Sequence, residues 1–502
     1  MLPDRRLSGV LLHPTAMPGG YGIGDLGASA SEWVAWLAST GCGAWQILPI
    51  GPTGFGDSPY QLLSTFAGNP LLISLDQLHQ AGLLPRSALA LDAGPPDRVD
   101  YETVIRQRDH ALRQAHAAFR QRAGKGLLAE YEAYLARQAD WLEPFALFMA
   151  LKDQQSGRAW DQWPVDWRQR QPEALETARR EMAEQIDRHR FCQFVFDRQW
   201  QALRDQCRQA GILIIGDLPI YVAHDSADVW AQPEVFQLDD TGQPQVVGGV
   251  PPDYFSEDGQ RWGNPIYRWD RMQTNDFAWW IARLRRTLEW VDVVRLDHFR
   301  GFEAFWQIPA EEPSAVKGRW QPGPGAALFR AIESALGALP LIAEDLGVMT
   351  PGVVSLRQQF GLPGMNVLQF AFDGGADNPY LPHNHRWDSV VYTGTHDNDT
   401  TRGWYETADP AIRRRCQDYL GLSNERVADA MVRTAWASVC RLAVAPLQDL
   451  LELGSEARFN RPGVAQGNWR WRATPGALDT SLAERLAHRN QTFGRTTASS
   501  PA

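Results

Sequence analysis

The stretch ILIIGDL at residues 212–218 is a run of aliphatic side chains that ends beside an acidic residue. Near-continuous hydrophobicity over so few residues is typical of a strand buried on both faces of a parallel sheet. Further runs share the pattern: AWQILPI (44–50), VDVVRL (291–296), LPLIA (339–343), MNVLQF (365–370), SVVYT (389–393) and VCRLA (439–443). Helix-period sequence lies between the runs, and Asn275 or Asp276 can cap the helix before VDVVRL. This alternation predicts either a doubly wound sheet or a closed barrel of strands and helices.

Two long segments interrupt the alternation. Residues ~76–210 are mostly helical sequence, and residues ~223–275 are rich in Gly, Pro, Trp and Tyr and read as irregular loop. Barrel folds tolerate long insertions in their loops, so we expect one catalytic domain over residues 1–488 that carries both insertions. The polar residues 489–502 are expected to form a disordered tail.

The composition excludes several classes of protein. The 502 residues include 44% hydrophobic and 22% charged residues, and the formal net charge is −10. A negative surface repels nucleic acid and anionic lipid, so we expect neither nucleic acid nor membrane as a partner. The five cysteines are scattered, without a CxxC motif or a Cys/His cluster, which argues against disulfides and structural zinc. Without a recognisable signal peptide or membrane span, the sequence predicts a reduced, cytoplasmic protein of unknown oligomeric state.

Acidic residues mark the ends of several predicted strands. Asp217 follows ILIIG (212–216), Asp297 follows VDVVRL, Glu344 follows LPLIA, and Asp397 comes shortly after SVVYT. In α/β barrels the carboxyl ends of the strands carry the catalytic loops, so these carboxylates are expected to meet at one mouth. A single acid after a strand is usually a helix cap. Capping is a poor explanation for four such acids in one chain.

Converging carboxylates without a metal cage or an activated Ser or Cys are typical of glycoside cleavage. One carboxylic acid protonates the departing sugar oxygen, and a second carboxylate attacks the anomeric carbon or activates water. Arg295 lies two residues before Asp297, so both side chains project from the same face of the strand. Some of the 21 tryptophans can offer flat apolar faces to sugar rings.

Two rival motifs are weaker. The segment GIGDLG (22–27) matches the GxGxxG pattern of dinucleotide sites, but the nearest strand candidate ends at His13 and no acid closes the following strand. Among the eleven histidines, His383 and His385 have metal-ligand spacing, but they lie in a Pro/Asn-rich loop with no strand before it. We therefore expect no cofactor and no metal.

Four segments resemble the signature regions of the α-amylase superfamily: GDLPIYVAHDSADVW (216–230), RLDHFRGF (295–302), AEDLG (343–347) and THDNDT (395–400). Further segments resemble one branch of it, the amylomaltases or 4-α-glucanotransferases: WQILPIGPTGFGDSPYQ (45–61), FAGNPLLISL (66–75), GVPPDYFSEDGQRWGNPIYRW (249–269), GMNVLQFAFD (364–373) and RFNRPG (458–463). The resemblance covers nearly the whole chain. It implies an α/β protein with a (β/α)8 TIM barrel and helical and irregular insertions at the catalytic face.

Position by position, the resemblance implies that Asp297 is the nucleophile, Glu344 the general acid and base, and Asp397 the stabiliser of the transition state. Sugar contacts are implied for Tyr60, Tyr101, Asp217, Trp262, Arg295, His396 and Asn460, and His298 is a further candidate because it follows Asp297. Two departures from the family pattern, Phe459 for Met and Asp57 for Asn, put the sugar contacts near Asn460 and Ser58 in doubt.

The implied reaction is transfer of a segment of an α-1,4-glucan to the 4-hydroxyl of an acceptor glucan or glucose, with retention of configuration. The implied partners are maltooligosaccharides, amylose and glycogen-derived dextrins. The segment Gly249–Pro265, which includes Tyr254 and Trp262, is expected to act as a lid and acceptor platform. Two alternatives are an α-1,4-glucan hydrolase and a non-catalytic glucan-binding barrel.

Overall fold

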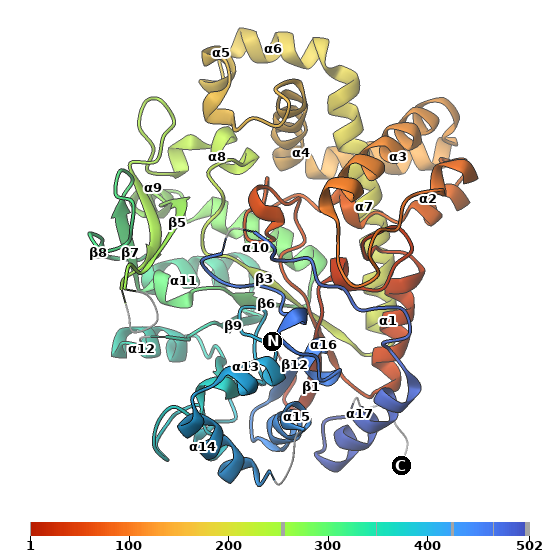
Figure 1. The fold of residues 1–502 in the computed structure, drawn as a ribbon. Helices are drawn as coiled ribbons and strands as arrows, with labels where there is room; N and C mark the ends of the chain where they lie inside the picture. Colours follow the sequence, from red (N-terminus) through yellow and green to blue (C-terminus); the bar gives the residue numbers. More distant parts are fainter. Residues whose placement is uncertain (1, 253–256, 348, 423–425, 465, 497–502) are drawn as a thin grey trace.

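The computed structural model describes residues 2–252, 257–347, 349–422, 426–464 and 466–496. Its central sheet consists of parallel strands in the order β10 (Gly364–Val367), β11 (Ser389–Tyr392), β12 (Leu442–Pro446), β1 (Leu7–Leu11), β2 (Ala44–Gln46), β3 (Leu213–Leu218), β6 (Val293–Leu296) and β9 (Leu341–Ala343) (Figure 1). The amide of Ala343 donates to the carbonyl of Pro363, just before β10, at 2.9 Å. This bond brings the two edge strands together, and the expected (β/α)8 barrel is confirmed.

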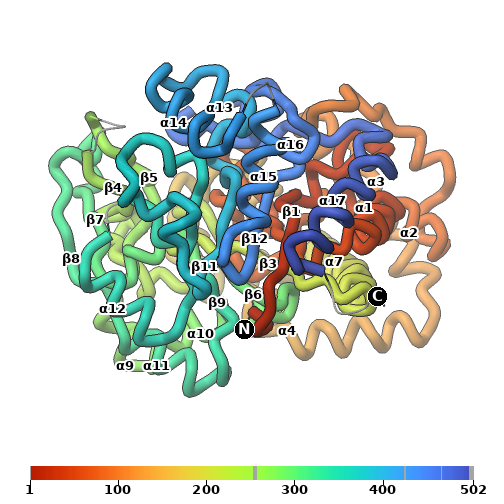
Figure 2. The backbone as a smooth tube through the Cα atoms, turned by 90° about the horizontal axis from the view of Figure 1, so that it is seen from below, coloured from red at the N-terminus to blue at the C-terminus, as the bar shows by residue number. Residues whose placement is uncertain are grey.

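Helices surround the barrel, most of them between successive strands and two of them after the last strand. They are α1 (Ala28–Ser39), α7 (Ala183–Gln209), α10 (Ala278–Trp290), α11 (Gly325–Leu336), α12 (Pro351–Gln359), α13 (Thr401–Thr407), α14 (Pro410–Leu420), α15 (Val427–Ala437), α16 (Leu447–Leu450) and α17 (Thr480–Thr492). Aromatic side chains join the two layers: Trp200 of α7 packs against Trp45 of β2, and its indole NH donates to the carbonyl of Trp290 at 2.9 Å. Figure 2 shows β1 beside β12, so the first strand of the chain lies against the last strand of the barrel.

The start of α10 differs from the prediction. The residue before the helix is Phe277, whose φ is 55°, and no side chain caps the helix. Asp276 also has a positive φ, of 52°. The backbone therefore turns through two consecutive left-handed residues, and the expected cap by Asn275 or Asp276 was wrong.

The segment expected as a helical insertion contains α2 (Leu75–Gln80), α3 (Tyr101–Arg122), α4 (Lys125–Gln154), α5 (Val165–Arg168), α6 (Pro172–Glu181) and α7. Most of these helices lie at the top and right of Figure 1. The last of them also belongs to the barrel, because Arg204 of α7 donates to the carbonyl of Val291 at 2.9 Å, two residues before β6. The insertion and the barrel therefore share one helix.

The segment ~223–275 contains regular structure, so its prediction as irregular loop was wrong. It holds α8 (Ala227–Ala231), β4 (Val246–Val250), β5 (Gln260–Pro265) and α9 (Trp269–Thr274), and β4 and β5 pair in an antiparallel sheet with β7 (Ala304–Pro309) and β8 (Arg319–Pro322). Its glycines serve close packing: a Cβ at Gly248 would lie 2.5 Å from the ring of Tyr221. Tyr254 and the rest of residues 253–256, expected in the lid, lie outside the described residues.

The expected tail at residues 489–502 is ordered in its first part. Helix α17 continues to Thr492, and the buried Asn490 donates to the carbonyl of Thr40 at 2.7 Å. Arg495 is fully buried, and its guanidinium donates to backbone carbonyls that include that of Leu7 at 2.7 Å. The polar composition of residues 489–502 led to the prediction of a disordered tail, because composition does not show that these side chains bind backbone carbonyls elsewhere in the fold. Residues 497–502 lie outside the described part of the chain.

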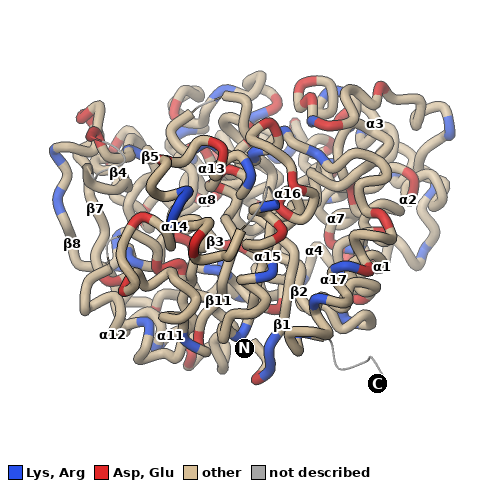
Figure 3. Tube along the Cα trace, turned by 60° about the horizontal axis from the view of Figure 1, so that its bottom comes forward, with Lys and Arg blue, Asp and Glu red and all other residues tan. Residues whose placement is uncertain are grey.

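Acidic and basic residues are interspersed along the chain (Figure 3). Among the described residues, no helix is both long and apolar enough to cross a membrane.

Candidate active site

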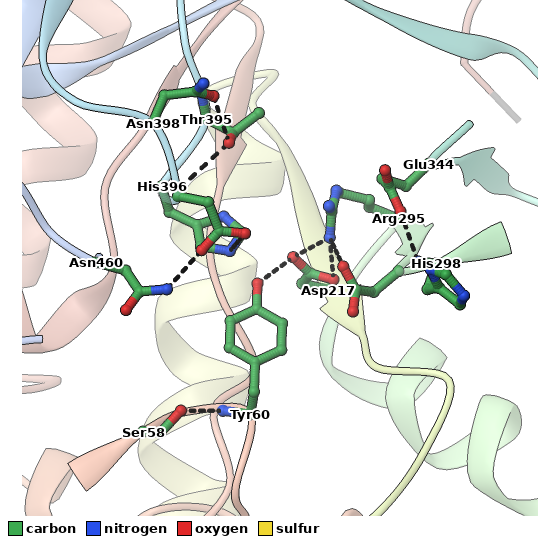
Figure 4. A network of polar contacts seen from close by, with 12 residues as sticks. Ser58, Tyr60, Asp217, Arg295, His298, Glu344, Thr395, His396, Asn398 and Asn460 are labelled. Carbon is green, nitrogen blue, oxygen red and sulfur yellow. Dashed lines mark hydrogen bonds and ion pairs between the residues drawn. The ribbon is translucent and has the colours of Figure 1, made fainter. Parts of the chain in front are cut away.

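Asp217, Arg295 and Asp297 form a row across two neighbouring strands. The register of β3 and β6 sets Asp217 opposite Arg295. Nη1 of Arg295 donates to both carboxylate oxygens of Asp217 at 2.8 Å (Figure 4) and to Oδ1 of Asp297 at 2.9 Å. Side-chain exposure rises along the row, from 0% for Asp217 and 4% for Arg295 to 27% for Asp297. Asp297 is therefore the member of the row that a ligand can reach.

The charge of Arg295 is secured by its neighbours. Burial alone lowers the pKa of this guanidinium, but Asp217 and Asp297 outweigh burial and hold the pKa well above its usual value. Burial raises the pKa of Asp217, and the Arg295 cation opposes that effect. The row thus contains a permanent cation between a buried carboxylate and an accessible one.

Glu344 begins the loop after β9 and faces this row (Figure 4). Its carboxylate accepts hydrogen bonds from the backbone amides of His298 at 2.7 Å and Leu346 at 3.2 Å. His298 can present its amide in this way because its backbone is left-handed, with a φ of 53°. Burial is the main reason that the pKa of Glu344 is raised to about 8. The negative charge of Asp297 raises this pKa further, and the positive charge of Arg295 lowers it. Glu344 is therefore mostly protonated at neutral pH, as a general acid must be.

Asp397 lies in the loop after β11, on the other side of the site. Nδ2 of Asn460 donates to its Oδ1 at 2.6 Å, and Nε2 of His396 lies 3.3 Å from its Oδ2. Burial raises the pKa of Asp397, but the His396 charge and hydrogen bond, together with the Asn460 bond, hold that pKa well below its usual range. The side chain of Asp397 is 44% exposed. It is therefore an accessible, ionised carboxylate.

Tyr60 connects the two sides of the site. Its hydroxyl donates to Oδ2 of Asp217 at 2.8 Å, and its ring stacks on that of His396 with centroids 5.1 Å apart. Ser58 accepts from the Tyr60 amide at 3.2 Å, so it supports the backbone of the loop that carries Tyr60. In Figure 4, Tyr60 points from this loop toward Asp217 and lies between the Asn460 side and the Arg295 side.

Trp262 of β5 forms a further wall beside His298. The two rings meet edge to face at 4.8 Å, and the indole NH donates to Oε1 of Gln260 at 3.1 Å. Burial lowers the pKa of His298 to about 4, although Asp297 opposes this shift. His298 is therefore a neutral imidazole at neutral pH, able to donate a hydrogen bond without adding a charge.

The structure does not bring Tyr101 into this constellation. Its ring is 3% exposed, and its hydroxyl donates to the backbone carbonyl of Trp469 at 3.0 Å. A buried ring offers no face to a sugar, so the predicted sugar contact of Tyr101 is not supported.

Two residues at the site were missed by the sequence reasoning. Trp469 packs behind Tyr60, with ring centroids 5.8 Å apart, and Arg458 donates to the backbone carbonyl of Asp397 at 2.8 Å. Arg458 could have been found, because it lies in the RFNRPG motif two residues before Asn460. Trp469 follows a Gly-rich loop and carries no periodic signal.

The departure at Phe459 leaves the neighbouring contact intact. Phe459 is 5% exposed and packs edge to face against Trp469 at 5.6 Å. Its ring therefore fills the interior, while the next residue, Asn460, reaches Asp397 as described above.

Across the described residues, no group of three or more His, Cys, Asp or Glu side chains could hold a metal ion.

Known proteins resemble this chain over nearly its whole length. A family model described as 4-alpha-glucanotransferase matches residues 12–478. The chain belongs to this family. The 4-alpha-glucanotransferase of Thermus thermophilus is 51% identical over 490 residues, which are 96% of this chain and 97% of that protein. That of Synechocystis sp. is 48% identical over 499 residues and covers 98% of each chain.

A solved structure is also closely similar. The amylomaltase from Streptococcus agalactiae, determined in complex with acarbose, has a TM-score of 0.95 and 37% sequence identity to this chain. The match covers 98% of this chain and 100% of that one. The resemblance found in the sequence is thereby confirmed for the family and for the fold.

Proposed function

We propose that this 4-alpha-glucanotransferase family member acts on α-1,4-glucans by a retaining double displacement. The single observation that carries the mechanism is the contrast between two acids on neighbouring strands. Asp297 is bonded to the Arg295 cation at 2.9 Å, whereas burial raises the pKa of Glu344 to about 8. One group is thus equipped as a nucleophile and the other as a proton donor.

In the first half-reaction, the Asp297 carboxylate attacks the anomeric carbon of the donor glucan. Arg295 holds Oδ1 of Asp297, so we assign the attack to Oδ2. The bond between the anomeric carbon and the bridging oxygen breaks, and Glu344 gives its proton to that oxygen. The products are a glucosyl ester on Asp297 and a shortened glucan with a free 4-hydroxyl. The ionised Asp397 stabilises the positive charge that develops on the sugar.

Ester formation prepares Glu344 for its second role. The ester has no negative charge, so the contribution of Asp297 to the raised pKa of Glu344 disappears. Glu344, now a carboxylate, accepts the proton of the acceptor's 4-hydroxyl as that oxygen attacks the anomeric carbon. Asp297 leaves as a carboxylate, and a new α-1,4 bond closes the cycle.

A bound acceptor must compete with water for the ester. We assign Trp262 to the acceptor side, because it stands against His298, the residue whose amide holds Glu344. A sugar stacked on the indole would place its hydroxyl next to the base and displace water from that position. Tyr60, Asp217, His396 and Asn460 are then assigned to the donor sugar.

A product ladder from maltotriose tests this proposal, with glucose and total reducing ends measured separately. Transfer produces glucose together with maltopentaose and longer chains, and the number of reducing ends stays constant. Maltose and glucose with rising reducing ends would instead indicate a hydrolase. Retained maltodextrin binding without turnover would indicate a non-catalytic barrel.

We also propose a cytoplasmic location. All five cysteines are buried and free, which is consistent with a reducing compartment.

A further inference from the structure

Trp469 stands behind the two aromatic residues of the site. Its ring lies 5.8 Å from that of Tyr60 and 6.1 Å from that of His396, centroid to centroid. Tyr60 and His396 also stack on each other, so the three rings form a cluster. Trp469 is only 5% exposed. It therefore touches the groups assigned to the sugar without being available to the sugar itself.

The backbone of Trp469 has an unusual conformation. Its φ is 64°, in the left-handed region that bulky residues rarely adopt. Such a conformation persists only where its surroundings hold it, and this occurs most often near functional sites. Two bonds hold it here: the amide of Trp469 donates to the carbonyl of Phe459 at 2.7 Å, and its carbonyl accepts from the Tyr101 hydroxyl at 3.0 Å.

The segment around Trp469 is also tied to the start of α3. The amide of Val99 donates to the carbonyl of Arg470 at 2.6 Å, and the amide of Arg472 donates to the carbonyl of Asp97 at 2.9 Å. Together with the Tyr101 bond, these contacts link the start of α3, within the helical insertion, to the wall of the active site. The insertion therefore has a direct structural connection to Tyr60 and His396.

We infer that Trp469, held in place by Tyr101, is a positioning residue that fixes the rings of Tyr60 and His396 for glycosyl transfer. The inference rests on the proposed function and adds residues to its site. It also assigns a role to Tyr101, which supports the site through Trp469 instead of contacting the sugar.

The physical reason lies in how each ring is held. The Tyr60 hydroxyl must meet Oδ2 of Asp217, and Nε2 of His396 must face Oδ2 of Asp397. The Trp469 ring packs against both of these rings, so it restricts their rotation about the Cα–Cβ bonds, which would carry the polar atoms away from their partners. Misplacing a positioned group by about 1 Å can cost on the order of 100-fold in rate.

The test uses three variants and a matched control, assayed by initial rates of transfer from maltotriose and by thermal unfolding. Trp469→Leu removes the ring, Trp469→Phe keeps an aromatic ring, and Tyr101→Phe removes the hydroxyl that holds the Trp469 carbonyl. The control is Trp471→Phe, two residues along the same segment, where Trp471 lies outside the ring cluster and bridges to Arg98.

For Trp469→Leu we expect kcat to fall by roughly 10- to 100-fold with KM changed by less than about threefold, because transition-state contacts are lost and ground-state binding is retained. Trp469→Phe should recover most of the rate, and Tyr101→Phe should lower kcat by about three- to tenfold. The control should keep both constants and its Tm. If Trp469→Leu does not fold, Tyr101→Phe decides, because an unchanged kcat in that variant overturns the inference.

A double-mutant cycle with Tyr60→Phe separates positioning from a general loss of stability. If Trp469 acts through Tyr60, the combined loss in kcat is smaller than the product of the two single losses. A full product, or losses that follow Tm alone, would overturn the inference. If the wild type transfers normally and Trp469→Leu is equally active, only this inference is refuted. Wild-type protein that does not transfer refutes the proposed function.

Discussion

Replacing Glu344 with Gln tests the protonation state on which the proposed mechanism depends. Burial first, and then Asp297, raise the pKa of Glu344 to about 8, whereas the unfolded chain keeps the ordinary value of about 4.3. The folded protein therefore retains a proton that the unfolded chain releases in this interval. By linkage, the free energy of unfolding of the wild type decreases as the pH rises from about 4.3 to about 8. Gln does not ionise, so the free energy of unfolding of the variant lacks this decrease with pH.

The magnitude follows from the shift. Between pH 5.5 and pH 9 the wild type loses about 3 kcal/mol, at up to about 1.4 kcal/mol per pH unit below the folded pKa. A chain of 502 residues has an unfolding entropy of about 2.1 cal/mol/K per residue, so 1 kcal/mol corresponds to about 1 °C in Tm. We expect the Tm of the variant minus that of the wild type to grow by about 3 °C between pH 5.5 and pH 9.

Comparing the Tm difference at two pH values removes the effect of the changed hydrogen bonds in the Gln variant. In the wild type the amides of His298 and Leu346 both donate to the carboxylate, and the NH2 of Gln would oppose one of them. That mismatch costs about 1–3 kcal/mol, but it is the same at both pH values and cancels. The matched control is Glu176→Gln, because the side chain of Glu176 is 73% exposed.

The assay combines differential scanning fluorimetry across this pH range with the pH profile of wild-type transfer. The kcat/KM of the wild type should be level just below about pH 8 and should fall about tenfold per unit above it, because the acid must be protonated. A Tm difference that does not change with pH, or a kcat/KM profile without a fall above pH 8, would refute the reasoning about Glu344.

Three further outcomes are expected. Asp297→Asn should keep the thermal unfolding profile and lower kcat by at least about 10⁴-fold, because an amide cannot form the ester; substantial residual transfer would contradict the nucleophile assignment. Asn460→Ala removes a bond of 2.6 Å that lowers the pKa of Asp397, so the acid limb of the kcat profile should move to higher pH; an unmoved limb would show that Asp397 does not depend on Asn460. Treatment with EDTA should leave the transfer rate unchanged, because the described residues contain no cluster for a metal ion, and a loss restored by divalent cations would contradict that expectation.

Much of the barrel could be predicted from local sequence. Runs such as ILIIGDL and VDVVRL are apolar on both faces, and few environments other than a parallel sheet accept them, so the strands were found close to their true bounds. The same logic failed for β4, because Gly248 and Gly249 suggest a loop when their close neighbours are unknown. It failed again at residues 489–496, because Asn490 and Arg495 bind backbone carbonyls of Thr40 and Leu7, hundreds of residues earlier in the chain.

By itself, the sequence determined which acids stand at the ends of the strands, because the order of apolar runs and polar ends is a local property. Motif resemblance then distinguished Asp297, Glu344 and Asp397 from other acids. Only the tertiary structure determined the protonation states of these acids and the residues that hold them in place. The pKa of Glu344 depends on burial and on Asp297 across the strand interface, and the place of Tyr101 behind Trp469 depends on two segments more than three hundred residues apart. Such effects act through space, and no pattern along the chain encodes the distances that govern them.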